Sequence, residues 1–337
     1  MNKIKELFFK LNNGEFLTKH DSVTLFDLIF TEKLSEIEIS SLLTFLNLQG
    51  ESFENIYGAV EVLKKYKRKI DLNCSDLIDT CGTGGDNKGS FNISTATSIL
   101  ASACGLKVAK HGNRSVTSKT GSSDILESLG INIFLSDVQL KKFFKKNNIC
   151  FLFAPNFHKS LRIVSNIRKL LPFKTIFNLI GPLLNPAKLK YQLLGVGNPS
   201  NLLTHARYLS QSSIRSAWVI HSAGYDELTT TAPNMIYKIK NKKVSKKMIL
   251  NPKDLGFKLA TIGELQGGNA KENSYIMFRL FEGETGGIRD CVLLNTAACL
   301  MIAGKVKTIV EGIEYASNKI DDYSAKKKLE QLIEKKN

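Results

Sequence analysis

The sequence has no apolar stretch long enough to span a membrane. A membrane helix needs about 20 consecutive apolar residues, and the most apolar stretch, Cys291–Ala303, is interrupted by Asn295 and Thr296. The first residues include lysines but also Glu6, and no apolar signal segment follows them. We therefore expect a cytoplasmic protein without a membrane partner.

Cysteine is scarce and lacks a metal-binding pattern. The six cysteines contain no Cys-x-x-Cys pair, and no histidine lies at ligand spacing from any of them. This argues against a zinc-binding module and a disulfide framework, so we expect reduced thiols in the core. Cys81 lies inside a glycine-rich loop. It is either a small residue packed beneath that loop or a reactive thiol.

Arginine is scarce in a chain that is strongly basic. The formal net charge is +16, but only 8 of the 47 basic residues are arginine. Arginine binds phosphate in bidentate geometry better than lysine does. Lysine runs such as Lys145-Lys146 and Lys242-Lys243 are therefore more typical of a solvated surface, and we do not expect a nucleic-acid partner. A nucleic-acid-binding relative without catalysis stays an alternative, since basic chains attract polyanions.

The first 70 residues show only helical spacing of apolar residues. The apolar positions of Ile4–Leu11 recur at three and four residues. Ser35 and Glu38 form a capping box for a second helix, and Gly50 is a helix-ending residue. A further helix is predicted over about 53–67. These segments predict a small helical bundle.

From about residue 72, short apolar runs alternate with helical segments. Strands are predicted at Leu77-Ile78, Leu106–Ala109, Ile131–Leu135, Cys150–Ala154, Leu193–Val196 and Ala217–Ile220, with short strands and turns in 226–262. Helices are predicted near 94–104, 122–129, 269–281, 287–303 and 305–335, and residues 158–190 again show helical spacing. Such alternation is typical of a sheet with many parallel pairs.

The expected fold is therefore α/β, with a small helical domain and a larger α/β domain. The helical domain comprises residues 1–70 and about 160–190. The α/β domain comprises residues 71–159 and about 191–337, and its mixed, mostly parallel central sheet is flanked by helices.

The glycine-rich segment Gly82-Thr83-Gly84-Gly85-Asp86 is the most informative part of the chain. It is neither a Walker A loop nor a Gly-x-Gly-x-x-Gly fingerprint. Glycine allows the backbone to approach a ligand closely, and the N–H groups of the helix that follows can bind an anion. We predict a phosphate site completed by Asn92, Ser94 and Thr95. A tight structural turn is the alternative.

A second polar cluster, Lys110–Ser122, lies between a predicted strand and a predicted helix. It contains Lys110, His111, Asn113 and Arg114 together with several hydroxyls and glycines. Cations supply charge and hydroxyls supply directed donors, so the cluster fits a second phosphate site. A polar loop without a ligand is the alternative.

Two further features carry possible chemistry. Asp226 and Glu227 follow a predicted strand, and adjacent carboxylates suit Mg²⁺ that also keeps phosphate and water ligands. A solvated acidic pair is the alternative. Arg168 lies in a predicted helix before Thr175–Pro186, where it could pair with a substrate carboxylate or lie on an ordinary helix surface.

In this order, the motifs resemble the anthranilate phosphoribosyltransferase family, which has the nucleoside-phosphorylase-like (class III) fold. The resemblance spans nearly the whole chain. It is carried by Gly82–Asp86, Asn92–Thr95, Lys110–Ser118, Gly121–Glu127, Thr175–Pro186, Asp226-Glu227 and Arg289-Asp290.

The resemblance implies transfer of a 5-phosphoribosyl group from phosphoribosyl pyrophosphate (PRPP) to the amino group of anthranilate, in tryptophan biosynthesis. It implies that PRPP is held by Gly82, Gly85, Asp86, Ser90, Asn92, Ile93, Ser94, Thr95, Lys110, His111, Gly112, Asn113, Arg114, Ser115, Val116, Thr117, Ser118 and Ser122. It implies Mg²⁺ as cofactor on Ser94, Asp226 and Glu227, and anthranilate on Gly82, Asn113 and Arg168.

The resemblance also implies a homodimer formed through the helical domain. Because the acceptor is an aniline that is largely unprotonated at neutral pH, we expect no nucleophilic residue and no essential base. Lys110 and Arg168 would act electrostatically. A pyrimidine nucleoside phosphorylase of the same fold is a further alternative.

Overall fold

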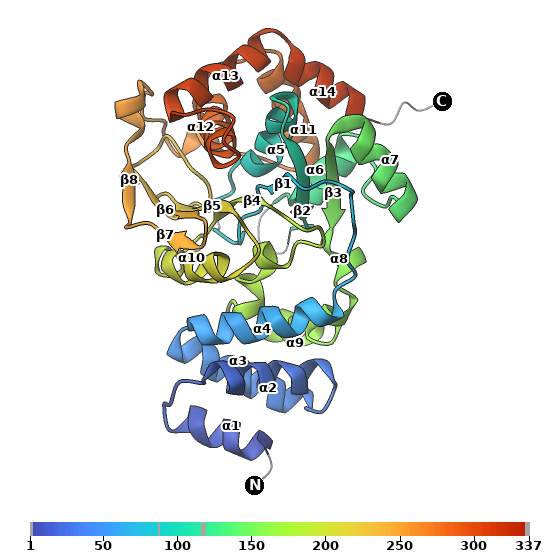
Figure 1. The fold of residues 1–337 in the computed structure, drawn as a ribbon, viewed down its shortest axis with the longest axis vertical. Helices are drawn as coiled ribbons and strands as arrows, with labels where there is room; N and C mark the ends of the chain where they lie inside the picture. Colours follow the sequence, from blue (N-terminus) through green and yellow to red (C-terminus); the bar gives the residue numbers. More distant parts are fainter. Residues whose placement is uncertain (1–2, 87, 116–118, 334–337) are drawn as a thin grey trace. The chain divides into compact units, whose positions relative to one another are not determined.

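The computed structural model describes residues 3–86, 88–115 and 119–333 (Figure 1). The chain divides into two compact units. The first is Met1–Lys69 with Pro155–Leu184, and the second is Ile70–Ala154 with Asn185–Asn337. The second segment of the helical unit thus lies at Pro155–Leu184, where the sequence suggested about 160–190. Among the described helices, none has the length and apolar character needed to cross a membrane.

The first unit is helical. Its N-terminal segment forms α1 (Lys3–Asn12), α2 (Lys19–Phe30), α3 (Glu36–Gln49) and α4 (Phe53–Tyr66). Its second segment consists of short helices: most of α8 (Ala154–Phe157), then η1 (Lys159–Arg162), α9 (Ser165–Leu170), η2 (Ile176–Asn178) and η3 (Gly181–Leu184).

Local sequence sets where the long helices of this unit begin and end. The capping box of Ser35 and Glu38 is present at the start of α3, and Gly50 ends that helix with φ 78°. Both predictions are confirmed. Thr18 and Asp21 form an equivalent box at α2. Each box satisfies backbone N–H groups that a helix start would otherwise leave without partners.

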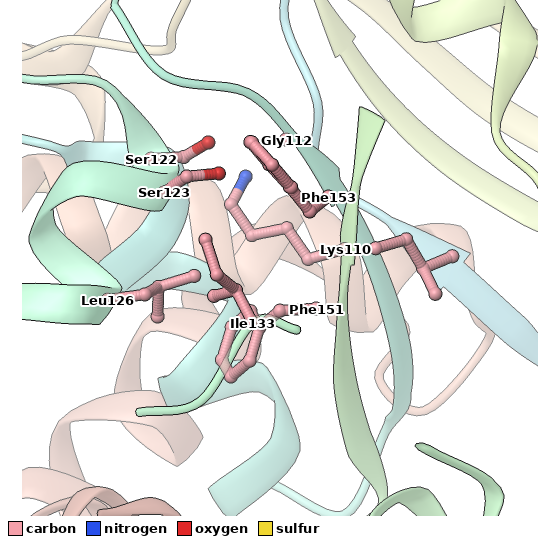
Figure 2. A pocket seen from close by; sticks show the side chains of 9 residues that line it. Lys110, Gly112, Ser122, Ser123, Leu126, Ile133, Phe151 and Phe153 are labelled. Carbon is pink, nitrogen blue, oxygen red and sulfur yellow. The ribbon is translucent and has the colours of Figure 1, made fainter. Parts of the chain in front are cut away.

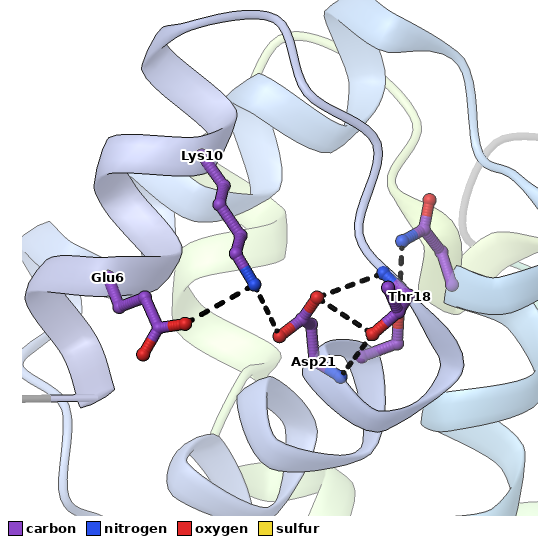
Figure 3. Close-up of polar contacts among 6 residues, drawn as sticks. Glu6, Lys10, Thr18 and Asp21 are labelled. Atoms are coloured by element: carbon purple, nitrogen blue, oxygen red, sulfur yellow. Dashed lines mark hydrogen bonds and ion pairs between the residues drawn. The ribbon is translucent and has the colours of Figure 1, made fainter.

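A polar contact also ties α1 to the start of α2 (Figure 3). The ammonium of Lys10 donates to Asp21 at 3.0 Å and lies 3.3 Å from Glu6. Asp21 accepts in addition from the backbone and the hydroxyl of Thr18. One carboxylate therefore caps α2 and fixes its contact with α1.

Residues 158–190, which show helical spacing in the sequence, form only short helices. Pro172, Pro182 and Pro186 interrupt the segment, and proline removes a backbone donor and disfavours helix interiors. The segment is instead fixed by packing. The ring of Phe177 lies edge-on to those of Phe26 and Phe30, with centroids 6.1 and 6.0 Å apart.

The second unit has one mixed sheet, and the predicted α/β class is confirmed. In the described residues the strand order is β3-β2-β1-β4-β5-β6-β7, with β8 also paired to β6. Pairs among β1 to β5 are parallel, and those made by β6 are antiparallel. The strands are β1 (Leu77–Asp79), β2 (Lys107–Gly112), β3 (Ile149–Phe153), β4 (Tyr191–Gly195), β5 (Ser216–His221), β6 (Asn234–Lys240), β7 (Lys243–Val244) and β8 (Met248–Leu250).

Helices cover both faces of this sheet. In Figure 1, α5 and α12 lie on one side of it and α10 on the other. The helices are α5 (Ile93–Ala103), α6 (Ser122–Ser128), α7 (Asp137–Asn147), α10 (Leu202–Gln211), α11 (Ala270–Phe281), α12 (Gly287–Ile302), α13 (Ile309–Asp321) and α14 (Ser324–Leu332), with short turns η4 (Pro199–Asn201), η5 (Pro252–Leu255) and η6 (Gly263–Leu265).

Three local predictions need correction. Ile131–Leu135 is not a strand; Ile131 and Ile133 are buried in the core without ladder pairing. The second strand does not stop at Ala109 but continues through Gly112, because β3 pairs with it along that length. The predicted helix over 305–335 is broken at Tyr323, whose φ of 59° is left-handed.

Candidate functional site

The glycine-rich loop leaves the carboxyl end of β1 and takes conformations that side chains disfavour. Gly84, Gly85 and Gly89 have φ values of 68°, 69° and 63°. This left-handed region favours glycine because a Cβ atom would be strained there. The sequence therefore forms a loop with little side-chain cover, directly before helix α5.

The acidic pair packs under this loop, as the sequence suggested for a shared site. The N–H of Gly84 donates to Oδ2 of Asp226 at 2.7 Å. A Cβ atom on Gly82 would lie 2.2 Å from the same oxygen, and one on Gly195 would lie 1.5 Å from the Asp226 carbonyl. The two glycines thus leave the space that Asp226 occupies.

The two predicted phosphate loops meet through Lys110. The Nζ atom of Lys110, a residue within β2, donates to Oγ of Ser94 in the first turn of α5 at 3.1 Å. Lys110 is almost fully buried, with 2% of its surface exposed. Burial raises the pKa of Glu227, whereas the charge of Lys110 and the backbone N–H of Ser94 lower it by a smaller amount, so the carboxyl lies near both groups. Residues from all three predicted motifs therefore surround one place.

The second cluster is held by its own side chains. The N–H of Asn113 and Oγ of Ser122 lie 3.2 Å apart, and that hydroxyl also donates to the Asn113 carbonyl at 3.2 Å. Asp124 accepts from the N–H groups of Ser115 and Gly121. Asn113 and Arg114 are exposed, whereas His111 is buried. The predicted residues Val116, Thr117 and Ser118 lie outside the described residues.

The remaining predicted residues of the first loop divide into two groups. Asn92 links the loops, because its Nδ2 donates to the Thr120 carbonyl at 3.1 Å and its Oδ1 accepts from Asn273 at 2.9 Å. Gly85, Asp86 and Ser90 are partly exposed around the loop. In contrast, Ile93 and Thr95 are buried on the core side of α5, so their side chains face the protein interior.

Negative charge is crowded beneath the loop. The carboxyl of Glu227 is enclosed by protein atoms, although part of the residue stays accessible. This desolvation raises its pKa well above the ordinary value, and the charges of Asp226 and Asp86 raise it further. The ammonium of Lys110 acts in the opposite direction. The pair is therefore short of positive charge.

This charge deficit tests whether the residues fit a divalent cation. Two adjacent carboxylates with a nearby hydroxyl form a partial oxygen ligand set, which is the kind Mg²⁺ uses together with phosphate and water. Within 3–86, 88–115 and 119–333, no three His, Cys, Asp or Glu residues are grouped as a complete metal site. The residues fit a cation that substrate oxygens help to bind.

A small cavity lies behind Lys110 (Figure 2). It is lined by Lys110, Ser122 and Ser123 at its polar end and by Leu126, Ile133, Phe151 and Phe153 at its apolar end. Figure 2 shows the ammonium of Lys110 directed toward the two serine hydroxyls. The space suits a water molecule rather than an aromatic ring, so it does not supply an acceptor pocket.

Arg168 belongs to the helical unit and lies in α9. Its guanidinium is centred 5.7 Å from the ring centroid of Phe177. Burial lowers its pKa, and Nε has no hydrogen-bond partner among the described residues. A half-buried arginine with an unused donor is suited to a carboxylate ligand.

The thiol of Cys81 does not have the properties of a nucleophile. Burial, together with the negative charge of Asp79, raises its pKa, so it stays protonated at neutral pH. All six cysteines are free. Of the two interpretations, the packed thiol is the one that the local electrostatics favour.

Sequence reasoning missed three buried side chains that organise the site. Asp79 ends β1 and accepts from the N–H groups of Thr80 and His111. Asn185 donates to Asp79, and Asn295 in α12 holds both backbone polar groups of Leu228. Asn295 was visible as a polar residue within an apolar run. Asn185 lies within the segment Thr175–Pro186 and Asp79 lies just before the glycine-rich segment, but neither was assigned a role from the sequence.

Comparison with known proteins identifies the family to which the chain belongs. A family model described as "Glycosyl transferase family, a/b domain" matches residues 74–326, and one described as "Glycosyl transferase family, helical bundle domain" matches residues 5–66. The anthranilate phosphoribosyltransferase of Petrotoga mobilis is 43% identical, covering 96% of this chain and 94% of that protein. The chain belongs to the anthranilate phosphoribosyltransferase family. The enzyme of Acetivibrio thermocellus is also 43% identical, covering 98% and 96% of the two chains.

Solved structures of anthranilate phosphoribosyltransferases share the fold. The structure from Thermus thermophilus has a TM-score of 0.90 and 32% identity, covering 99% of this chain and 98% of that one. The Saccharomyces cerevisiae enzyme in complex with PRPP and Mg has a TM-score of 0.89 and 27% identity, covering 98% and 96%.

Proposed function

We propose that this chain transfers the 5-phosphoribosyl group of PRPP to the amino group of anthranilate, releasing pyrophosphate, as in tryptophan biosynthesis. One observation carries the proposal: Lys110 reaches Ser94 at 3.1 Å, which brings the two predicted phosphate loops together. Asp226 accepts from the N–H of Gly84 in the first loop. Relatives support the choice of ligands. The S. cerevisiae enzyme has been solved with PRPP and Mg, and with 4-fluoroanthranilate.

The roles proposed for individual residues follow the sequence prediction. PRPP would be held by Gly82, Gly85, Asp86, Ser90, Asn92–Thr95, Lys110–Ser118 and Ser122, with backbone and hydroxyl donors aimed at its phosphates. Ser94, Asp226 and Glu227 would hold Mg²⁺, and Gly82, Asn113 and Arg168 would hold anthranilate. When bound, Mg²⁺ supplies the positive charge that the acidic pair lacks and stabilises pyrophosphate oxygens.

The reaction exchanges one bond at C1 of the ribose for another. The C1–O bond to pyrophosphate breaks through an oxocarbenium-like centre, the amine nitrogen forms the C1–N bond, and its extra proton passes to water. The ammonium of Lys110 stabilises the charge that develops on the leaving group. Arg168 orients the acceptor through its carboxylate, and such orientation can lower a barrier by as much as ~7–11 kcal/mol.

An activity assay tests the proposal. Purified protein given PRPP and MgCl₂ is expected to remove the fluorescence of anthranilate with equimolar release of pyrophosphate. Absence of turnover at every Mg²⁺ concentration would contradict the proposal. Phosphorolysis of thymidine would instead support the nucleoside phosphorylase alternative. Binding to DNA with a steep salt dependence and no turnover would support the nucleic-acid-binding alternative.

We also propose a homodimer and a cytoplasmic location, as the family resemblance implies. Sedimentation equilibrium of the purified chain measures the mass in solution. A monomer at all concentrations would contradict the dimer.

A further inference from the structure

We propose that Asp79 and Asn185 are positioning residues, which extend the pairing of β1 with β2 by side chains and so fix the spacing of the two phosphate loops. The inference rests on the proposed PRPP site and concerns residues that do not touch the substrate. It explains how Lys110 and His111 are held beside the glycine-rich loop.

The backbone pairing of β1 with β2 ends early. The paired residues are Leu77 with Lys107 and Ile78 with Val108, whereas β2 runs on to Gly112 beside β3. The N–H of Val108 donates toward β3, and backbone groups of a parallel strand alternate in direction. The groups of Ala109 and His111 therefore face the side on which β1 has ended.

Two side chains replace the missing strand. Oδ1 of Asp79 accepts from the N–H of His111 at 3.2 Å. Nδ2 of Asn185 donates to the Ala109 carbonyl at 2.9 Å and to Oδ2 of Asp79 at 2.7 Å. Asp79 is completely buried and 5% of Asn185 is exposed. A buried backbone group without a partner is costly, so these contacts hold β2 in place on both sides of Lys110.

The same carboxylate also holds the glycine-rich loop. Oδ1 of Asp79 accepts from the N–H of Thr80 at 2.8 Å, where that loop leaves β1. The Thr80 hydroxyl donates to the Ser94 carbonyl at 3.1 Å. Lys110 also donates to the Ser94 hydroxyl. Both predicted phosphate loops are therefore held in position by contacts that lead back to the buried carboxylate of Asp79. Burial raises the pKa of Asp79, and the nearby positive charge of Lys110 opposes that shift.

The substitution Asp79→Asn tests this arrangement with little change in volume. Either orientation of the new amide places an N–H₂ group against a donor, at Asn185 or at His111. Binding of PRPP with MgCl₂ is measured by isothermal titration calorimetry. We expect about 10–100-fold weaker binding, the loss typical of a group that orients a binding residue. The KM for anthranilate should change less than about threefold, a split that general destabilisation does not produce.

The matched control is Ser102→Ala. The Ser102 hydroxyl is buried and donates to the Asn147 carbonyl at 3.1 Å, near the far end of α5 from Ser94. This variant loses a buried hydrogen bond of the same unit, yet PRPP binding should stay within about twofold. A second readout is hydrogen exchange at the His111 amide, which should become faster in Asp79→Asn and stay unchanged in the control.

The outcomes separate the two proposals. If the wild-type chain does not bind PRPP, the proposed function fails. If the wild-type chain binds PRPP and Asp79→Asn binds it equally well, the positioning role is overturned. Should Asp79→Asn not fold, Asn185→Ala serves in the same comparison. Unchanged PRPP binding and unchanged exchange at His111 in that variant would also overturn the inference.

Discussion

The amide of Asn295 pairs with both backbone polar groups of Leu228. Its Oδ1 accepts from the Leu228 N–H at 3.1 Å, and its Nδ2 donates to the Leu228 carbonyl at 2.7 Å. Asn295 is completely buried in α12. Because Leu228 directly follows Glu227, a helix side chain fixes the backbone that presents the acidic pair.

Replacing Asn295 with alanine should weaken the response to Mg²⁺. The change leaves two buried backbone groups without partners, at a cost of about 1–3 kcal/mol in the free energy of unfolding for each group. We expect the Mg²⁺ concentration for half-maximal activity to rise about tenfold. A Mg²⁺ titration at saturating PRPP measures it, with Ser102→Ala as control. An unchanged Mg²⁺ response would remove Asn295 from this role.

Gly82→Ala should abolish most activity through a steric effect. A Cβ atom there would lie 2.2 Å from Oδ2 of Asp226, so the carboxylate or the loop must move. We expect kcat/KM for PRPP to fall about 100-fold, corresponding to about 2.7 kcal/mol. Gly263→Ala is the matched control, because its Cβ atom would meet nothing closer than 3.9 Å. Equal activity of the two variants would contradict the packing described for Asp226.

Neutralising the acidic pair should separate function from stability. Asp226→Asn with Glu227→Gln removes the proposed metal ligands, and we expect a fall of at least about 100-fold in kcat. Burial and mutual repulsion raise the pKa of Glu227, so the charged pair costs folding energy. The midpoint of thermal unfolding of the double variant, measured in EDTA, should therefore stay the same or rise. Asp254→Asn, which changes an exposed carboxylate, should alter neither kcat nor the midpoint of thermal unfolding. Retained turnover would contradict the metal assignment.

The helical unit should lose stability in acid through His158. Burial first, and the charge of Lys67 second, lower the pKa of His158 to about 4 from 6.5. Between these values the unfolded chain binds a proton that the folded chain does not. The free energy of unfolding is therefore highest above pH 6.5, and it decreases by up to about 3 kcal/mol as the pH falls toward 4.

Urea unfolding followed by circular dichroism at pH 4.5 to 7 measures this effect. His158→Gln should flatten the pH dependence in that window, whereas His20→Gln, which changes an exposed histidine of the same unit, should not. The same slope in His158→Gln and in the wild-type chain would show that another group is responsible.

The sequence was informative where local rules decide the structure. The box of Ser35 and Glu38, the stop at Gly50 and the loop at Gly82–Asp86 each depend on neighbouring residues, and each was predicted correctly. The alternating apolar residues of Ile131–Leu135 suggested a strand. Ile131 and Ile133 are instead buried by packing in the core, without pairing to a strand. The sequence could not indicate that pairing with β3 would extend β2 through Gly112.

The candidate site follows the same division. The motif residues were recognisable because glycines, hydroxyls and charges occur together. Asp79, Asn185 and Asn295 were not recognised, because their roles depend on contacts over 32 to 106 residues of sequence. Such contacts exist only once the sheet has formed, so no local sequence pattern predicts them.

The strand order has a consequence for synthesis of the chain on the ribosome. Strand β1 lies between β2 and β4, and β4 begins at Tyr191, after the second segment of the helical unit. Until Tyr191–Gly195 has been translated, β1 presents an open edge on that side, which is a template for unwanted pairing. The emerging chain is therefore exposed to aggregation throughout synthesis of the segment from Pro155 to Leu184, and until Gly195 has been added.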